Sequence, residues 1–419
     1  MIVVCAPNPG LLPPGDLVFS MLGAPFEDTF GVVGRTFREA VRRQGLDPSI
    51  KAWDFALLAL AIIAADHGCL RKESPDGWTR EIELHIALVQ PEIWEPHLEL
   101  LAQALRFLSG DIWSLKVHQG GLSPLTRTRR TKTPIVEGDC VCLLSGGVDS
   151  LIGGIDLVAQ GFKPVFVSQV AKGDSDRQST FATAIGQSQC GHVQLTHAVN
   201  VPDTSERSQR ARSVMFLALG SLVASTIEDD GACELIVPEN GFISYNVPLT
   251  HRRIGSLSTR TTHPHFLGLV QQLWDNVGIK TQIRNPYQHM TKGEMLSQCS
   301  NQTLLRSHVF SATSCGRFGR FGYQHCGRCV PCLVRRAAFL AWGQVDTTQY
   351  VYTDLGAQDD FDDVRSSAMA CIVTQRRGVR RWSRNALSCL YVDDVDSAES
   401  LVGRGLNEIR ALLERQGVL

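Results

Sequence analysis

Residues 141–150, with the sequence VCLLSGGVDS, join four apolar residues to a serine and two adjacent glycines. A helical pattern follows from 151 to 160 and ends at Gly161, so the predicted order is strand, loop and helix. Adjacent glycines let the backbone turn tightly and point successive N–H groups at one place, where the helix N-terminus adds partial positive charge. The segment therefore predicts a loop that binds phosphate.

The polar residues of this loop suit the same ligand. The hydroxyls of Ser145 and Ser150 can donate hydrogen bonds, and Asp149 could either hold magnesium that bridges phosphates or cap the helix. A loop whose glycines serve backbone geometry alone is the alternative. The Gly-x4-Gly-Lys-Ser/Thr pattern of a Walker A loop does not occur, so ordinary γ-phosphate hydrolysis is not indicated.

The segment around this loop has the alternating strand and helix pattern of an α/β domain. Short apolar runs at 140–144, 165–170, 193–199 and 235–238 alternate with longer helical patterns. Alternation of this kind predicts right-handed βαβ units and a doubly wound parallel sheet. We place this domain at residues 138–340.

The 419 residues are more than one core usually contains, and we expect further units on both sides of this domain. Residues 1–122 predict a small α+β accessory domain, with a buried helix at 56–65, a strand at 81–86 and a helix at 96–107. Glycines, a proline and the basic run 127–132 predict a linker at 123–137.

Residues 341–419 predict a helical extension that includes a long helix at 397–416. The same extension carries a basic stretch with one tryptophan, RRGVRRWSR, at 376–384. Such a stretch either contacts a polyanion or forms a solvated helix face.

Four of the 13 cysteines form a C-x10-C-x2-C-x2-C pattern, at Cys315, Cys326, Cys329 and Cys332. Four thiolates at this spacing can close a tetrahedral zinc site that leaves no open position, which is the form of a structural site. An iron–sulfur cluster is the alternative, because C-x2-C-x2-C also suits that chemistry. The pattern predicts a zinc-binding segment at the end of the α/β domain.

The loop and the cysteines together resemble a known family. Ser145-Gly146-Gly147-Val148-Asp149-Ser150 resembles the PP-loop of the N-type ATP pyrophosphatases, whose HUP-like members cleave ATP between the α and β phosphates to adenylate a substrate. Ser314-Cys315 and HCGRCVPCLVRRAAF at 325–339 resemble the zinc segment of the QueC family of 7-cyano-7-deazaguanine synthases. Members of that family adenylate the carboxylate of 7-carboxy-7-deazaguanine, which ammonia then attacks.

The resemblance implies roles for residues outside the loop. Arg212-Ser213 stands where QueC-like proteins carry Arg-Asn and would clamp phosphate, and Lys292 belongs to a Thr-Lys-x-Glu pattern that faces the nucleotide and substrate in that family. A solvated helix face is the alternative for both. The resemblance makes Ser145, Asp149, Lys292 and Arg212 candidate catalytic residues, and Gly146, Gly147, Val148, Ser150 and Ser213 further nucleotide-binding residues.

A polar stretch after the apolar run 235–238 predicts the substrate loop, because ligands of open α/β sheets lie at the carboxyl ends of strands. A merely structural polar loop is the alternative. The predicted substrate-binding residues are Glu239, Asn240, Asn246, Ser258, Thr259, Arg260, Thr261 and His263.

This loop and the added N-terminal domain resemble the longer QueC-like proteins of bacterial antiviral operons, such as QatC of the Qat system. That resemblance implies ATP-dependent adenylation of a deazaguanine-type carboxylate, with ATP, Mg²⁺ and Zn²⁺ as cofactors. Amide formation with an amine of a partner protein would follow. The alternatives are housekeeping synthesis of 7-cyano-7-deazaguanine with ammonia, a tRNA-modifying PP-loop enzyme, and a catalytically dead nucleotide-binding scaffold.

Charge and hydropathy limit which partners and which cellular compartment we expect. Lys and Arg number 41 against 42 for Asp and Glu, so no global field draws the chain to nucleic acid or to an anionic membrane. The longest apolar run, 55–65, is about half of the roughly 20 residues that span a bilayer. We expect a cytoplasmic protein with no membrane or nucleic-acid partner.

Overall fold

The structure is a computed structural model. It describes residues 1–126, 136–170, 173–187, 189–227, 231–250, 260–356, 362–388 and 395–419. The basic run 127–132 of the predicted linker lies outside these residues.

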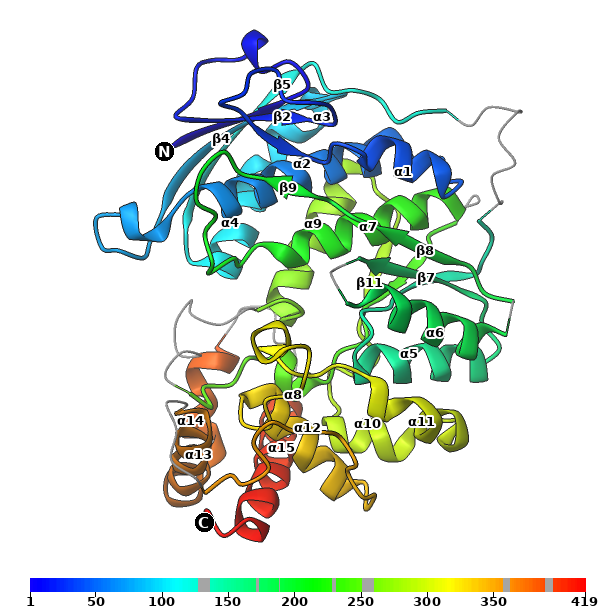
Figure 1. The fold of residues 1–419 in the computed structure, drawn as a ribbon, viewed down its shortest axis with the longest axis vertical. Helices are drawn as coiled ribbons and strands as arrows, with labels where there is room; N and C mark the ends of the chain where they lie inside the picture. The colour runs from blue at the N-terminus through cyan, green and yellow to red at the C-terminus, as the bar shows by residue number, and fades with distance from the viewer. Residues whose placement is uncertain are drawn as a thin grey trace.

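Two β-sheets organise the chain, and the second of them is doubly wound as predicted. Its five strands all pair in parallel, in the order β11-β10-β6-β7-β8 (Figure 1). These strands are β6 (Cys140–Leu143), β7 (Pro164–Gln169), β8 (His192–Leu195), β10 (Glu234–Ile236) and β11 (Gln282–Arg284).

Alternate residues of the central strand β6 enter cores on opposite faces of this sheet. Cys140 and Cys142 join the core formed with α5 (Val148–Ala159) and α6 (Ser175–Gly186). Val141 joins the core formed with α7 (Arg212–Ile227) and α9 (Pro264–Val277). A strand buried on both faces reads as an unbroken apolar run, which is why VCLL was recognisable in the sequence.

The first sheet corrects the predicted α+β architecture of the N-terminal part. Its strand order is β5-β4-β1-β2-β3-β9, and every neighbouring pair from β5 to β3 is parallel. Helices cross over between β3 and β4 and between β4 and β5, which is the connection that parallel strands require. Its elements are β1 (Ile2–Ala6), β2 (Leu17–Met21), β3 (Gly31–Val33), α1 (Phe37–Arg43), α2 (Ile50–Gly68), β4 (Glu81–Leu88), α3 (Pro91–Trp94), α4 (Leu98–Ser109) and β5 (Ile112–Gln119).

The predicted strand at 193–199 is divided between the two sheets. β8 ends at Leu195, and β9 (Val199–Asn200) pairs antiparallel with β3 of the first sheet. The chain turns at Ala198, whose φ is +24°, and Gly34 N donates to the carbonyls of His197 and Ala198. Hydrogen bonds to the first sheet thus end a pattern that is continuous in the sequence.

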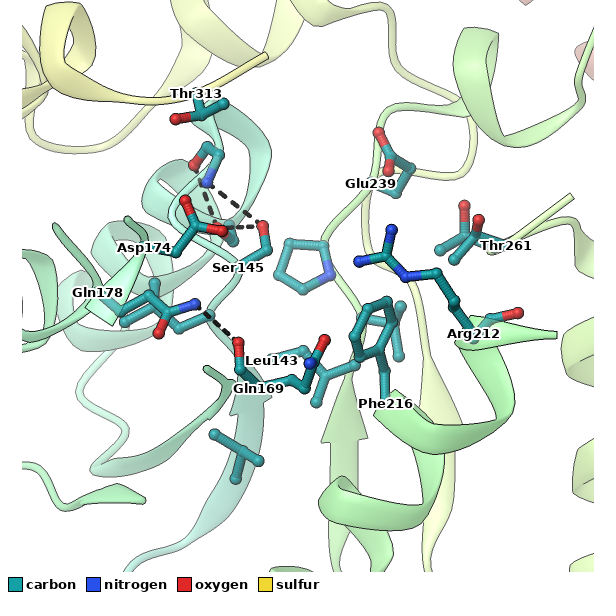
Figure 2. Close-up of a pocket in the computed structure, with 18 of the residues that line it drawn as sticks. Leu143, Ser145, Gln169, Asp174, Gln178, Arg212, Phe216, Glu239, Thr261 and Thr313 are labelled. Carbon is teal, nitrogen blue, oxygen red and sulfur yellow. Dashed lines mark hydrogen bonds between the residues drawn. The ribbon is translucent and has the colours of Figure 1, made fainter. Parts of the chain in front are cut away.

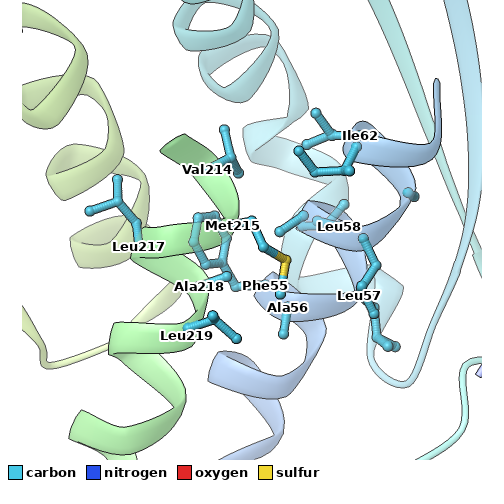
Figure 3. Close-up of a cluster of buried hydrophobic side chains, with 14 of the residues drawn as sticks. Phe55, Ala56, Leu57, Leu58, Ile62, Val214, Met215, Leu217, Ala218 and Leu219 are labelled. Atoms are coloured by element: carbon cyan, nitrogen blue, oxygen red, sulfur yellow. The ribbon is translucent and has the colours of Figure 1, made fainter. Parts of the chain in front are cut away.

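The apolar run 55–65 lies within α2, which the structure buries on all sides as predicted. Every residue from Ala52 to Asp66 is buried, and α2 lies between the first sheet and α7 (Figure 1). Figure 3 shows Phe55 and Leu58 of α2 beside Met215 and Ala218 of α7. One hydrophobic core therefore includes residues of both sheets.

All of the remaining helices except α8, which lies between β10 and β11, follow the second sheet in the chain, and several of them form a third core below it in Figure 1. In that core the indole of Trp382 is half-buried, while the arginines of the basic stretch 376–384 are exposed. Among the described residues, no helix combines the length and the apolar character needed to cross a bilayer. These helices are α8 (Gly241–Ser244), α10 (Lys292–Gln298), α11 (Gln302–His308), α12 (Val330–Ala341), α13 (Asp363–Arg377), α14 (Val379–Leu387) and α15 (Val395–Arg415).

Candidate nucleotide site and metal centre

A pocket of about 360 Å³ opens at the carboxyl end of β6. Strand order reverses here, since β7 and β10 flank β6 on its two sides, and this switch point is where open α/β sheets bind ligands. The pocket is lined by strand ends, by residues 212–219 of α7 and by residues 313–316, which include the first predicted zinc ligand (Figure 2). Its polar lining residues are Ser145, Ser150, Gln169, Asp174, Gln178, Arg212, Ser213, Glu239, Thr261, Thr262, Thr313 and Ser314.

The predicted phosphate loop forms one wall of this pocket. Ser145, Gly147 and Ser150 line it, whereas Gly146, Val148 and Asp149 do not. Gly146 has φ +82°, a left-handed conformation that glycine adopts without strain, and its carbonyl accepts from Thr313 N at 3.0 Å. The Ser145 and Ser150 hydroxyls lie 3.1 Å apart, and Ser145 Oγ accepts from Gly147 N at 3.3 Å. The loop is therefore held open towards the cavity.

Asp149 lies behind the loop in a buried cluster. Its carboxylate accepts from Lys292 Nζ at 2.6 Å and from Asn240 Nδ2 at 2.8 Å, and the side chains of Lys292 and Asp149 are 9% and 7% exposed. Burial raises the pKa of Asp149, but the Lys292 ammonium, with further hydrogen bonds, lowers it to about 2. The helix-cap role for Asp149 is wrong, because α5 begins at Val148 and its N-cap residue is Gly147, which has no side chain to cap it.

The first turn of α7 forms the opposite wall. Figure 2 shows the Arg212 guanidinium extending from α7 into the pocket, above the ring of Phe216. Arg212 is exposed and has no ion pair among the described residues, and the Ser213 hydroxyl is buried without a hydrogen-bond partner there. Both groups are donors that a bound anion would satisfy.

The N-terminal sheet unit positions this wall. Asp66 at the end of α2 accepts from the backbone N–H groups of Arg210 and Ala211 at 2.7 and 2.8 Å, immediately before α7 begins. Arg80 holds the other oxygen of Asp66 at 2.6 Å and also pairs with Asp111. All three side chains are almost fully buried, so the direction of α7 is determined by a charge network in the first core.

Of the predicted substrate residues, two line the pocket, four lie elsewhere in the structure, and two are outside the described residues. Glu239 and Thr261 line the pocket, whereas Asn240 bonds to Asp149 behind it, and Asn246 is buried away from it. Arg260 donates to the Phe107 carbonyl of α4 at 3.0 Å and stacks on the Phe107 ring. His263 accepts from His265 N as the N-terminal cap of α9. Ser258 and Thr259 lie outside the described residues.

The four predicted metal ligands form one buried cluster. Their Sγ atoms all lie within 4.8 Å of one another, and Cys315–Cys329 and Cys326–Cys332 are each 3.9 Å apart. Zn–S bonds of about 2.3 Å place tetrahedral sulfurs about 3.8 Å apart, so the donor set fits zinc. Cys315 Sγ accepts from the N–H groups of Arg317 and Cys326 at 3.4 Å, which favours thiolates.

The cysteine cluster continues into the pocket wall. Thr313, Ser314 and Cys315 are consecutive, and all three line the pocket. The buried guanidinium of Arg335 fixes this segment by donating to the carbonyls of Val309 and Ala312 and to Ser314 Oγ. A metal held by the four thiolates would therefore also fix one side of the pocket.

Sequence reasoning missed several residues of this pocket. Thr313, Gln169, Asp174 and Gln178 line it, and the Thr313 hydroxyl has no hydrogen-bond partner among the described residues. The signal available for Gln169 was its place at the end of an apolar strand beside β6. Thr313 had a signal too, because it lies two residues before the first ligand of the cysteine cluster.

The site thus combines, on an α/β fold with parallel sheets, a glycine loop at the switch point and a buried four-cysteine cluster beside it. The chain is similar to a 7-cyano-7-deazaguanine synthase of Rhizorhabdus wittichii, with 25% identity over 236 residues that cover 50% of this chain and 94% of the relative. No protein-family profile matches the chain. No solved structure matches it. The sequence comparison supports the predicted resemblance to the QueC family.

Proposed function

We propose that the chain is an ATP-dependent enzyme that adenylates a carboxylate in the pocket at the end of β6. The observation that carries this proposal is the placement of Ser145 and Gly147 across that pocket from Arg212. Main-chain and hydroxyl donors on one wall face a guanidinium on the other, which suits a polyphosphate between them. The similarity to a synthase supports an enzyme.

The geometry suggests a separate role in the reaction for each wall of the pocket. The Ser145–Ser150 loop would hold the β and γ phosphates, and an oxygen of the substrate carboxylate would attack the α phosphorus, with pyrophosphate as the leaving group. Arg212 would stabilise the negative charge that develops on the transferring phosphoryl group. A nitrogen nucleophile would then attack the acyl carbon, forming a C–N bond and releasing AMP.

Asp149 and Lys292 act differently in this scheme from the catalytic roles predicted for them. Their ion pair lies behind the loop and would hold the start of α5 in place. Magnesium neutralises phosphate charge when it is bound, and the carboxylates that line the pocket for it are Asp174 and Glu239. Asp149 is engaged with Lys292 and does not line the pocket.

The substrate that we propose is 7-carboxy-7-deazaguanine or a related carboxylate, because the curated relative is a 7-cyano-7-deazaguanine synthase. The nitrogen nucleophile is either ammonia or an amine of a partner protein. We keep conjugation to a partner protein in antiviral defence as the favoured prediction from the sequence resemblance.

The positions of the cysteines argue against the alternative of a tRNA-modifying enzyme. Thiolation by such enzymes requires a redox-active cysteine, and among the described residues Cys315 is the cysteine that lines the pocket. Cys315 belongs to the four-thiol cluster. The adenylating synthetase is therefore the better supported reading.

A turnover assay tests the proposal. We expect AMP and pyrophosphate in equal amounts from ATP when 7-carboxy-7-deazaguanine is present, and neither product without a carboxylate. Arg212→Met should reduce the rate by about 100-fold, while Arg415→Met, at an exposed position of α15, should leave it unchanged. Release of phosphate instead of pyrophosphate would refute the proposal.

The acceptor is tested separately by adding candidate partner proteins with ATP and the carboxylate. A mass gain on a partner equal to the carboxylate minus water indicates conjugation. A nitrile or amide product with ammonia alone, and no mass gain on any partner, indicates the small-molecule reaction.

A further inference from the structure

The C-terminal helix α15 packs against both segments that supply the partners of Asp149. One is the first turn of α10, which carries Lys292, and the other is α8, which begins directly after Asn240. In Figure 1, α15 lies beside α8 and α12 at the bottom of the molecule, far along the chain from the phosphate loop. The predicted C-terminal extension thus reaches the residues behind that loop.

Polar contacts join α15 to the start of α10. Thr291 Oγ1 donates to the Glu408 carboxylate, which also accepts from the backbone of Gly293. Arg404 Nε donates to Glu294 Oε1 at 2.5 Å. Thr291 and Glu294 form the capping box that begins α10, so Glu408 and Arg404 bind both members of the cap that flanks Lys292.

The packing at these contacts leaves no space for larger residues. A Cβ added at Gly293 would lie 2.5 Å from Glu408 Oε1, and one at Gly405 would lie 2.3 Å from the Phe242 ring of α8. At Gly241 a Cβ would lie 1.9 Å from the carbonyl of Gln288. Helix α15 is therefore packed closely against α8, and its Glu408 side chain lies against the first turn of α10.

The helix α10 depends on such external contacts. It has seven residues, and isolated helices of this length are unstable in water. Lys292 is its first residue, and its ammonium must remain 2.6 Å from Asp149 to compensate the buried carboxylate. A shift of the first turn of α10 would move this ammonium directly.

We propose that Glu408 and Arg404 are positioning residues, which hold the first turn of α10 so that Lys292 keeps Asp149 and the phosphate loop in their productive arrangement. This inference rests on the proposed function and deepens it, because it gives the C-terminal extension a role in the adenylation site. Glu408 acts through Thr291 and Lys292, and it does not line the pocket.

Two measurements test this on the full chain. The first is the rate at which an amine-acylating reagent labels Lys292, followed by peptide mass spectrometry. The second is the rate of carboxylate-dependent pyrophosphate release. We expect Glu408→Ala to accelerate Lys292 labelling at least 10-fold and to reduce kcat for pyrophosphate release by about 10- to 100-fold.

Two further variants separate positioning from general destabilisation. Glu408→Gln keeps an oxygen that accepts from Thr291, and we expect it to stay within about 3-fold of the wild type in both measurements. Glu414→Ala, at an exposed position of the same helix, should change neither. Burial raises the pKa of Glu408 to about 7, so glutamine resembles a form that the wild-type side chain itself adopts near neutral pH.

The outcomes distinguish the two proposals. Unchanged Lys292 labelling and an unchanged rate in Glu408→Ala would overturn the positioning role. Equal losses in Glu408→Ala and Glu408→Gln would also overturn it, because the conservative variant would then fail to rescue. A wild-type chain that releases no pyrophosphate with any carboxylate overturns the proposed function and the catalytic part of this inference, while the labelling still decides whether Glu408 places Lys292.

Discussion

Replacing Lys292 by methionine removes the cation from the buried pair behind the phosphate loop and leaves Asp149 without a counter-charge. The two atoms of this pair lie 2.6 Å apart, and both side chains are less than one tenth exposed. Removing one partner of a buried ion pair typically costs about 3–5 kcal/mol. We therefore expect Lys292→Met to lose about that much of its free energy of unfolding at pH 7.

The pKa of Asp149 supports this magnitude. A pKa of about 2 instead of 3.8 means that the folded protein, despite burial, favours the carboxylate by about 2 kcal/mol. This stabilisation is present above pH 3.8 and is lost as the pH falls through 2. In Lys292→Met the hydrogen bonds from Asn240 remain, but no ammonium offsets burial, which raises the pKa of Asp149. The deficit of this variant should therefore shrink as the pH is lowered from 7 to 4.

Chemical denaturation measured at several pH values tests this prediction. Asp149→Asn combined with Lys292→Met should be more stable than Lys292→Met at pH 7, because the buried charge is gone. Arg284→Met provides the matched control, since Arg284 pairs with Glu234 at 3.0 Å but both side chains are 44% exposed, and exposed pairs are worth about 0.2–1 kcal/mol. A Lys292→Met variant that loses no more stability than Arg284→Met would refute the reasoning.

Three further predictions concern the loop, the metal and the C-terminal helix. Gly146→Ala should lose about 1–2 kcal/mol of stability, because its φ is +82°, and it should also lose affinity for ATP in a binding titration. Gly161→Ala, at φ +92° and remote from the pocket, should lose stability but keep its affinity for ATP. Cys326→Ser should lose the bound metal, measured by elemental analysis, and weaken ATP binding at least 10-fold, because Cys315 and Thr313 share one segment of the pocket wall. The pKa of Glu408 is raised by burial, so the wild type should lose free energy of unfolding as the pH rises from about 4.5 to 7. Glu408→Gln has no such carboxyl and should become more stable relative to the wild type over that range. A constant difference between the two proteins across these pH values would contradict this.

The features that could be predicted are those whose residues are adjacent in the chain. The strand, glycines and helix around Ser145 follow one another directly, and the resulting loop lies at the switch point of a parallel sheet as expected. The cysteine spacing had the same advantage, because two C-x2-C turns place three ligands within seven residues. Local order was sufficient for both.

The features that could not be predicted depend on contacts between distant segments. Arg260 belongs to a polar stretch with the composition of a binding loop, but its side chain packs on Phe107 of α4. Val199 continues an apolar pattern, but it pairs with β3 of the other sheet. Asp149 has the chemistry of a metal ligand, but it is engaged with Lys292, which lies 143 residues further along the chain. Composition gives the chemistry of a side chain but not the direction in which it points.

The most direct test of the central claim uses the carboxylate substrate labelled with ¹⁸O in both oxygens. Attack of that carboxylate on the α phosphorus, followed by release of AMP after the nitrogen attacks, transfers one labelled oxygen to AMP. We predict that mass spectrometry finds AMP heavier by one ¹⁸O in each turnover. Unlabelled AMP, or the label in inorganic phosphate, would contradict adenylation at this site.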